Sequence, residues 1–193
     1  MSVFRWTAPL FKLAGRRWSE DDFEAVAEWL RPYVPTGGVF ADLGGGTGEL
    51  GAGIARVLEA QVVIIDATSQ MLRRVDPSPL VSVCLATAEH LPFTDAHFDG
   101  LLCCDAFHHV RGQHSAAHEI ARVVRPGGGV VILDAEPVGA NRGLVWFERL
   151  LGEPASFRTM PEMTRLLSDH GITGECTPQR RGYVFLGSVT PSL

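Results

Sequence analysis

A run of glycines between residues 44 and 48 constrains the fold of this chain more than any other feature. The apolar segment Val39-Phe-Ala-Asp-Leu precedes it and predicts a short buried strand, and residues 49–58 after it have the apolar period of a helix. Gln61-Val-Val-Ile-Ile-Asp then predicts a β-branched strand. Strand, tight glycine turn, helix and strand together make a βαβ unit, which builds parallel sheets.

The alternation of strands and helices continues on both sides of this unit. Arg125-Pro-Gly-Gly indicates a turn between a helix and a strand, and residues 175–181 and 183–189 predict an antiparallel pair joined at Gly182. Further helices are predicted at 20–31, 68–74, 115–124 and 161–169, and further strands at 80–85, 99–104 and 129–133. We expect an α/β fold: a single-domain, Rossmann-like, doubly wound sheet of seven strands, mostly parallel with an antiparallel last strand.

Composition supports one globular domain spanning residues 1–193. The chain is 46% hydrophobic and 20% charged, with a formal net charge of -5, so nucleic acid is not an expected partner. No apolar run approaches the roughly 18 residues that span a bilayer, and the N-terminal stretch lacks the apolar core of a signal peptide. The four cysteines include no C-x-x-C pair. We expect a cytoplasmic protein without integral membrane association, as a monomer or a homodimer.

The glycine loop alone fits two kinds of nucleotide site. Gly46-Thr-Gly-Glu-Leu-Gly satisfies the dinucleotide pattern G-x-G-x-x-G, with Asp66 following as a ribose acceptor. Asp42, at the end of the first strand, would repel a pyrophosphate but suits the cationic amino-acid end of S-adenosylmethionine. The charge of Asp42 therefore favours a sulfonium nucleoside.

Several blocks, in order, resemble class I S-adenosylmethionine-dependent methyltransferases. The resemblance is to the type 11 domain group, which includes the ubiquinone and menaquinone C-methyltransferases. The matching blocks cover about residues 38–134, the expected cofactor-binding core. They are Val39-Phe-Ala-Asp-Leu-Gly-Gly-Gly-Thr-Gly, Ile65-Asp-Ala-Thr-Ser-Gln-Met-Leu, Ala88-Glu-His-Leu-Pro-Phe, Phe98-Asp and Glu119-Ile-Ala-Arg-Val-Val-Arg-Pro-Gly-Gly.

This resemblance implies S-adenosylmethionine as cofactor and a role for individual residues. The methionine moiety would be held by Asp42, Gly44, Gly45, Gly46 and Gly48, the ribose by Asp66, and the adenine by Ala67 and Met71, with Ala88, Glu89 and Cys104 completing the cofactor set. Thr87 stands where the family usually has an aspartate that accepts from the adenine amino group. A hydroxyl accepts more weakly than a carboxylate, so this departure bears on cofactor affinity.

Candidates for the chemistry follow the strand at 99–104. Ligands of doubly wound sheets lie at the carboxyl ends of the strands, so Asp105, His108 and His109 are expected near the reactive methyl group. That methyl group is already activated, and a base is optional. A histidine that titrates near neutrality, His109 before His108, would take a proton from a phenol, enol or amine. The alternative, that both histidines cap or pack the following turn, stays open.

The density of histidines in this region raises the question of a metal. Four of the seven histidines lie between residues 108 and 118, and His114 and His118 share a helical face at a spacing of four. No H-E-x-x-H motif is present, and no carboxylate stands at a fixed ligand spacing. We expect no metal and a solvated helix face.

Acceptor specificity is expected from two segments outside the matching blocks. Residues 1–18 are predicted to form an N-terminal flap or a weak contact with a membrane surface, with disorder as the alternative. Residues 136–160, rich in aromatic side chains, are predicted to form an apolar substrate lid. The aromatic side chains would equally well cover the sheet edge. The expected function is methyl transfer to a small, apolar or aromatic acceptor. A small NAD(P)-binding oxidoreductase and a non-catalytic nucleoside-binding regulatory module are the alternatives.

Overall fold

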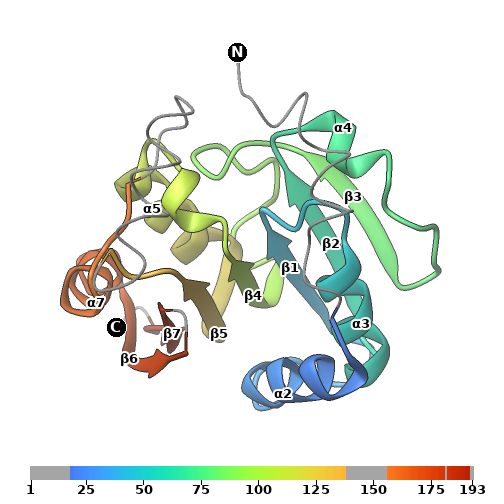
Figure 1. Cartoon of the computed structure of the whole chain (residues 1–193), viewed down its shortest axis with the longest axis horizontal. Helices are drawn as coiled ribbons and strands as arrows, with labels where there is room; N and C mark the ends of the chain where they lie inside the picture. Colours follow the sequence, from blue (N-terminus) through green and yellow to red (C-terminus); the bar gives the residue numbers. More distant parts are fainter. Residues whose placement is uncertain (1–17, 138–155, 181, 192–193) are drawn as a thin grey trace.

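A mixed seven-stranded sheet lies at the centre of the computed structural model, which describes residues 18–137, 156–180 and 182–191 (Figure 1). The strands are β1 (Val39–Leu43), β2 (Gln61–Asp66), β3 (Val81–Leu85), β4 (Phe98–Cys104), β5 (Val124–Asp134), β6 (Ile172–Gln179) and β7 (Gly182–Val189). The helices are α2 (Glu20–Leu30), α3 (Glu49–Leu58), α4 (Ser69–Leu72), α5 (Gln113–Val123) and α7 (Met160–Ser168), with a 3₁₀ turn η1 (Phe107–His109).

The strand order is β3-β2-β1-β4-β5-β7-β6. β1 to β5 pair in parallel, and β7 is inserted antiparallel between β5 and β6. The chain proceeds from β1 outward to β3, then returns to the other side of β1 for β4, so the switch point lies between β1 and β4 (Figure 1). The predicted fold class is confirmed. Ligands of such sheets lie at this point, outside the carboxyl ends of the strands.

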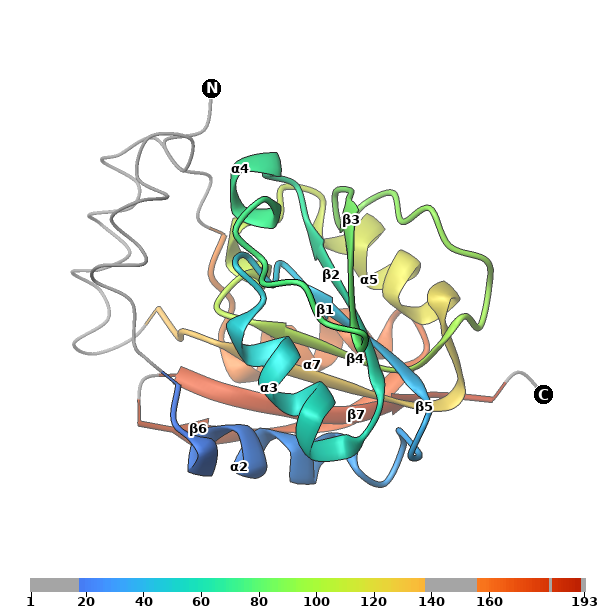
Figure 2. The ribbon, with the colours of Figure 1, turned by 90° about the vertical axis from the view of Figure 1, so that its right-hand side faces the viewer.

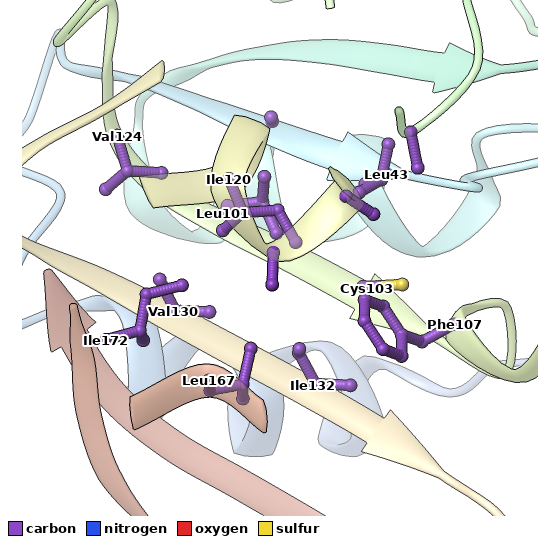
Figure 3. Close-up of a cluster of buried hydrophobic side chains, with 14 of the residues drawn as sticks. Leu43, Leu101, Cys103, Phe107, Ile120, Val124, Val130, Ile132, Leu167 and Ile172 are labelled. Carbon is purple, nitrogen blue, oxygen red and sulfur yellow. The ribbon is translucent and has the colours of Figure 1, made fainter. Parts of the chain in front are cut away.

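Helices cover both faces of the sheet, which explains why β1 is almost entirely apolar. Figure 2 shows α2 and α3 on one side of the sheet and α5 on the other. Phe23 and Ile54 pack from α2 and α3 against Phe40 of β1. On the opposite face, α5 and α7 pack against β4 and β5, where Leu101 and Ile132 are fully buried (Figure 3).

Most helices and strands of the structure begin and end close to the residues predicted from the sequence. The capping box of Ser19 and Asp22 starts α2, and α3 and β2 have the expected bounds. β5 differs, because it begins at Val124, which pairs with Phe98, and the register shifts between Phe98 and Gly100. The segment Arg125-Pro-Gly-Gly is thus an irregular part of β5, with Gly127 at φ 76°, rather than a turn before the strand.

Two predicted segments fall largely outside the described residues. Residues 1–17 of the expected flap and 138–155 of the expected lid are not described, so the proposed division of the chain stays a prediction. Among the helices of the described ranges, none has the length and apolar character needed to cross a bilayer.

Candidate active site

The glycine loop after β1 is open on one side and closely packed on the other. Gly44, Gly46 and Gly48 have φ of 74°, 57° and 76°, a left-handed conformation that favours glycine. A Cβ atom on Gly44 would lie 2.4 Å from the Cβ of Ala106, so the loop touches the turn after β4. A Cβ atom on Gly46 would meet no described atom within 4 Å. The loop can therefore receive a ligand against its backbone at Gly46.

Asp66 stands beside this open face, at the carboxyl end of β2. One carboxylate oxygen, Oδ2, accepts from the backbone N–H of Gly46 at 3.0 Å, and Oδ1 accepts from that of Thr68 at 2.7 Å. Partial burial raises the pKa of Asp66 against the opposing effect of these hydrogen bonds. Each oxygen can accept more than one hydrogen bond, so the carboxylate can also receive ribose hydroxyls.

Asp42 lies beneath the loop and faces α3. It is 2% exposed, and a Cβ atom added to Gly45 or Gly51 would come within 2.6 or 2.5 Å of its Oδ2 atom. Burial raises the pKa of Asp42 to about 7; a hydrogen bond from Gly51 opposes this effect, and the charge of Asp66 adds to it. Among the described residues, Oδ2 has no hydrogen-bond partner. Asp42 is placed to act on a ligand through the loop backbone and through its charge.

The residues expected around adenine come from the ends of β2 and β3 and from α4. Ala67 and Thr87 are exposed, while Met71 and Ala88 are 9% and 8% exposed. Glu89 accepts a hydrogen bond from the backbone N–H of Gly112 at 3.0 Å, which ties the turn after β3 to the start of α5. Burial alone would raise the pKa of Glu89, but the hydrogen bonds from Gly112 and Thr87 hold it below its usual value.

The turn after β4 brings together the residues expected to take part in chemistry. Cys104 is half-buried, and the following Asp105 has φ of 49° and donates its backbone N–H to the carbonyl of Leu133 at 2.9 Å. His108 is 5% exposed, and its Nδ1 atom is hydrogen-bonded to Oδ1 of Asp134, which is also 5% exposed. A buried imidazole–carboxylate pair thus joins the turn after β4 to the end of β5.

Residues 156–158 lie over this pair. The ring of Phe157 stacks on the imidazole of His108, with 4.3 Å between centroids and 12° between planes. The backbone N–H of Ser156 donates to the carbonyl of His108 at 2.8 Å. The Gln113 side chain donates to the carbonyl of Ser156 at 2.8 Å and accepts from Arg158 at 2.6 Å. These bonds fix the segment against the start of α5.

His109 differs electrostatically from the sequence-based expectation. Its ring centroid is 4.0 Å from that of His108. Burial, and to a smaller extent the charge of His108, lower the pKa of His109 to about 4. The expectation that His109 titrates near neutrality is wrong, because the side chain lies in a low-dielectric environment beside a second imidazole.

The partners of the histidines are not among the residues predicted from the sequence. Asp134 was assigned to no role, although a carboxylate directly after a buried strand at the ligand edge is a signal that was available. Gln113 and Ser156 gave no signal, since their contacts join segments far apart in the sequence. In the described ranges no three or more His, Cys, Asp or Glu side chains are grouped so that they could hold a metal ion.

Comparison with known proteins agrees with this geometry. Residues 41–132 match the family model described as a methyltransferase domain. The chain carries a class I methyltransferase domain of the type 11 group. The match covers the glycine loop, Asp66 and both histidines, and the predicted resemblance is confirmed. The domain is similar to the ubiquinone/menaquinone biosynthesis C-methyltransferase of Ralstonia nicotianae, at 31% identity over 146 residues that cover 66% of this chain and 60% of the relative.

Solved structures show how far the likeness extends. A chain from the complex between the Haloferax volcanii Trm112 methyltransferase activator and a methyltransferase superimposes with a TM-score of 0.78 at 15% identity, covering 99% of both chains. A methyltransferase from Thermotoga maritima gives 0.71 at 17% identity, covering 97% of this chain and 98% of the other. These likenesses show the fold alone. The match to the curated relatives spans about three fifths of their length.

Proposed function

We propose that the methyltransferase domain transfers the methyl group of S-adenosylmethionine to a small-molecule acceptor. The observation that carries this proposal is the open face of the loop at Gly46, with the carboxylate of Asp66 beside it. A nucleoside bound at the ends of β1 and β2 would lie at the switch point, and we propose that its reactive end is directed toward β4. The His108–Asp134 pair lies at that neighbouring edge.

The residues present fit this cofactor. Asp66 would accept from the ribose hydroxyls, and the backbone of Gly44–Gly48 would lie against the methionine moiety, with the charge of Asp42 beneath it. Ala67, Met71 and Ala88 would pack on adenine, and Thr87, Glu89 and Cys104 would border the nucleoside. Asp105 would lie near the reactive methyl group. When bound, S-adenosylmethionine supplies a methyl group on a positively charged sulfur. The protein then has to align the acceptor with that group and exclude water.

His108 is the group we propose to accept a proton from the acceptor, ahead of His109. Asp134 holds Nδ1 of His108 as the N–H donor, so that Nε2 is the nitrogen able to take a proton. His109, with its pKa near 4, is a weak base at neutral pH. In this assignment Asp134 is a positioning residue, and His109 lines the acceptor site.

For the acceptor we propose a small apolar or aromatic molecule, bound near Phe157 and His108. The stacking of Phe157 on His108 supports this, because it puts an aromatic ring beside the proposed base. The Ralstonia relative is named as a C-methyltransferase of ubiquinone and menaquinone biosynthesis.

Thermal unfolding with three ligands tests the cofactor. S-adenosylmethionine and S-adenosylhomocysteine should each raise Tm, and NADH should not, because a ligand of the native state stabilises it by mass action. A rise in Tm with NADH alone would contradict this proposal and would favour an NAD(P)-binding oxidoreductase.

Turnover needs a separate measurement. Release of S-adenosylhomocysteine should be followed with a panel of phenols, quinols and aromatic amines, with acceptor-free protein as the blank. We expect at least one acceptor to raise product release above the blank. Tight cofactor binding with no release across the panel would instead favour a nucleoside-binding regulatory module.

A further inference from the structure

Three histidines meet on the surface between two helices that are separate in the sequence. His114 and His118 are exposed one turn apart on α5, and the partly exposed His170 follows the end of α7. The two helices contact each other on the same face of the sheet (Figure 1). The arrangement of His114 and His118 was visible in the sequence, but the approach of His170 was not.

One ring nitrogen of His114 and one of His170 already have the separation of two nitrogens bound to the same metal ion. Nδ1 of His114 and Nε2 of His170 are 3.2 Å apart. Zinc binds histidine nitrogen at about 2.0–2.1 Å in tetrahedral geometry, which puts two such nitrogens about 3.3–3.4 Å apart. In the chain without metal, one ring donates its N–H to the other. For a divalent cation to bind, the donor ring has to carry its proton on its other nitrogen, and both rings have to turn so that the two lone pairs point at one ion beside the line between the nitrogens.

Binding requires neutral imidazole rings, because the unprotonated nitrogen is the form that coordinates a metal. The ring centroid of His118 is 6.4 Å from that of His170, so the third imidazole is close but does not yet complete a group of three.

We propose that His114 and His170 bind a borderline divalent cation such as Zn²⁺, which links α5 to the end of α7. Water fills the remaining positions, and a change of side-chain rotamer allows His118 to join as a third ligand. Imidazole nitrogen suits Zn²⁺, Cu²⁺ and Ni²⁺, whereas Mg²⁺ prefers oxygen ligands. The site uses none of the residues assigned to the cofactor and does not depend on methyl transfer.

Isothermal titration of the tag-free full chain with zinc chloride tests the site. We expect one Zn²⁺ per chain at neutral pH, a rise in Tm on binding, and no heat with magnesium chloride. His114→Ala and His170→Ala should each weaken zinc binding roughly tenfold or more, because each removes one of the two imidazole ligands that already lie together. His118→Ala should cause a smaller loss.

The matched control is His97→Ala, which removes an exposed histidine near the start of β4. It should leave zinc affinity unchanged. Circular dichroism establishes that each variant is folded, and acidification should abolish binding to the wild-type chain because protons compete for the imidazoles. Equal zinc affinity in the wild-type and His170→Ala chains would overturn the proposal, as would the absence of zinc binding to the wild-type chain.

Discussion

Nδ1 of His108 and Oδ1 of Asp134 are hydrogen-bonded across the carboxyl ends of β4 and β5, with both side chains 5% exposed. The pairing fixes the orientation of the imidazole, and the backbone N–H of Ala135 donates to the same oxygen at 2.8 Å. Parallel pairing of Cys104 with Leu133 sets the register that brings the two residues together. The contact therefore depends on the central sheet and not on a surface loop.

Asp134→Asn should lower turnover far more than cofactor affinity. The amide keeps the shape of the side chain but loses the charge that supports a protonated imidazole. If His108 is the base, we expect turnover to fall by about 10² or more, with the Kd for S-adenosylmethionine nearly unchanged. Single-turnover kinetics and titration calorimetry give the two quantities. His108→Gln should have an effect of similar size, and full turnover in either variant would exclude a base role for the pair.

Gly46→Ala and Gly37→Ala form a matched pair that locates the ligand. Both positions have positive φ, 57° and 76°, and a Cβ atom at either meets no described atom within 4 Å. Both substitutions should therefore cost a similar backbone strain of about 1–2 kcal/mol, measurable by urea unfolding. Only Gly46→Ala should weaken S-adenosylhomocysteine binding, because only there would a ligand occupy the space. Equal affinity in the two variants would show that the nucleoside does not bind against the loop.

Asp66→Ala should weaken the nucleoside without unfolding the chain. Hydrogen bonds to a charged group are worth about 1.5–3 kcal/mol, so the Kd should rise at least tenfold. Loss of the contacts to Gly46 and Thr68 adds to this effect by loosening the loop. Asp76→Ala, at an exposed position after α4, is the control and should bind normally. An unchanged Kd for Asp66→Ala would show that Asp66 does not contact the nucleoside.

Local patterns in the sequence were sufficient to predict the fold because the signals agreed with one another. Buried β-branched runs, the glycine loop and the Ser19 cap each determine structure over a few residues. The largest difference is at the start of β5, where pairing with Phe98 extends the strand through Pro126 and Gly127. Tertiary pairing there overrode the local preference for a turn.

The candidate site was only partly predictable, for a physical reason. Loop glycines and Asp66 are recognisable because the backbone geometry and the strand end determine their position. The electrostatic character of His109 and the partner of His108 depend on burial and on contacts across 26 residues, which the sequence does not encode locally. The same holds for His170, which reaches His114 from 56 residues away.

The buried carboxyl of Asp42 should make stability fall as pH rises. Its pKa is raised from 3.8 to about 7, so the folded state disfavours the ionised form. The contribution of Asp42 to the free energy of unfolding is fully present below about pH 4 and is lost as pH increases to about 7. At about 1.4 kcal/mol per unit of pKa, the loss is on the order of 4 kcal/mol. Urea unfolding from pH 4 to pH 8 measures it.

Asp42→Asn separates this effect from all other titrations. The amide carries no charge at any pH, so the difference in unfolding free energy between wild-type and variant should change steadily up to about pH 7 and level off above it. Asp76→Asn, exposed after α4, should keep the wild-type dependence. A saturating cationic nucleoside should reduce the fall in the wild-type chain, because a nearby positive charge favours the carboxylate. Parallel curves for wild-type and Asp42→Asn would show that Asp42 ionises in the folded chain at its ordinary pKa.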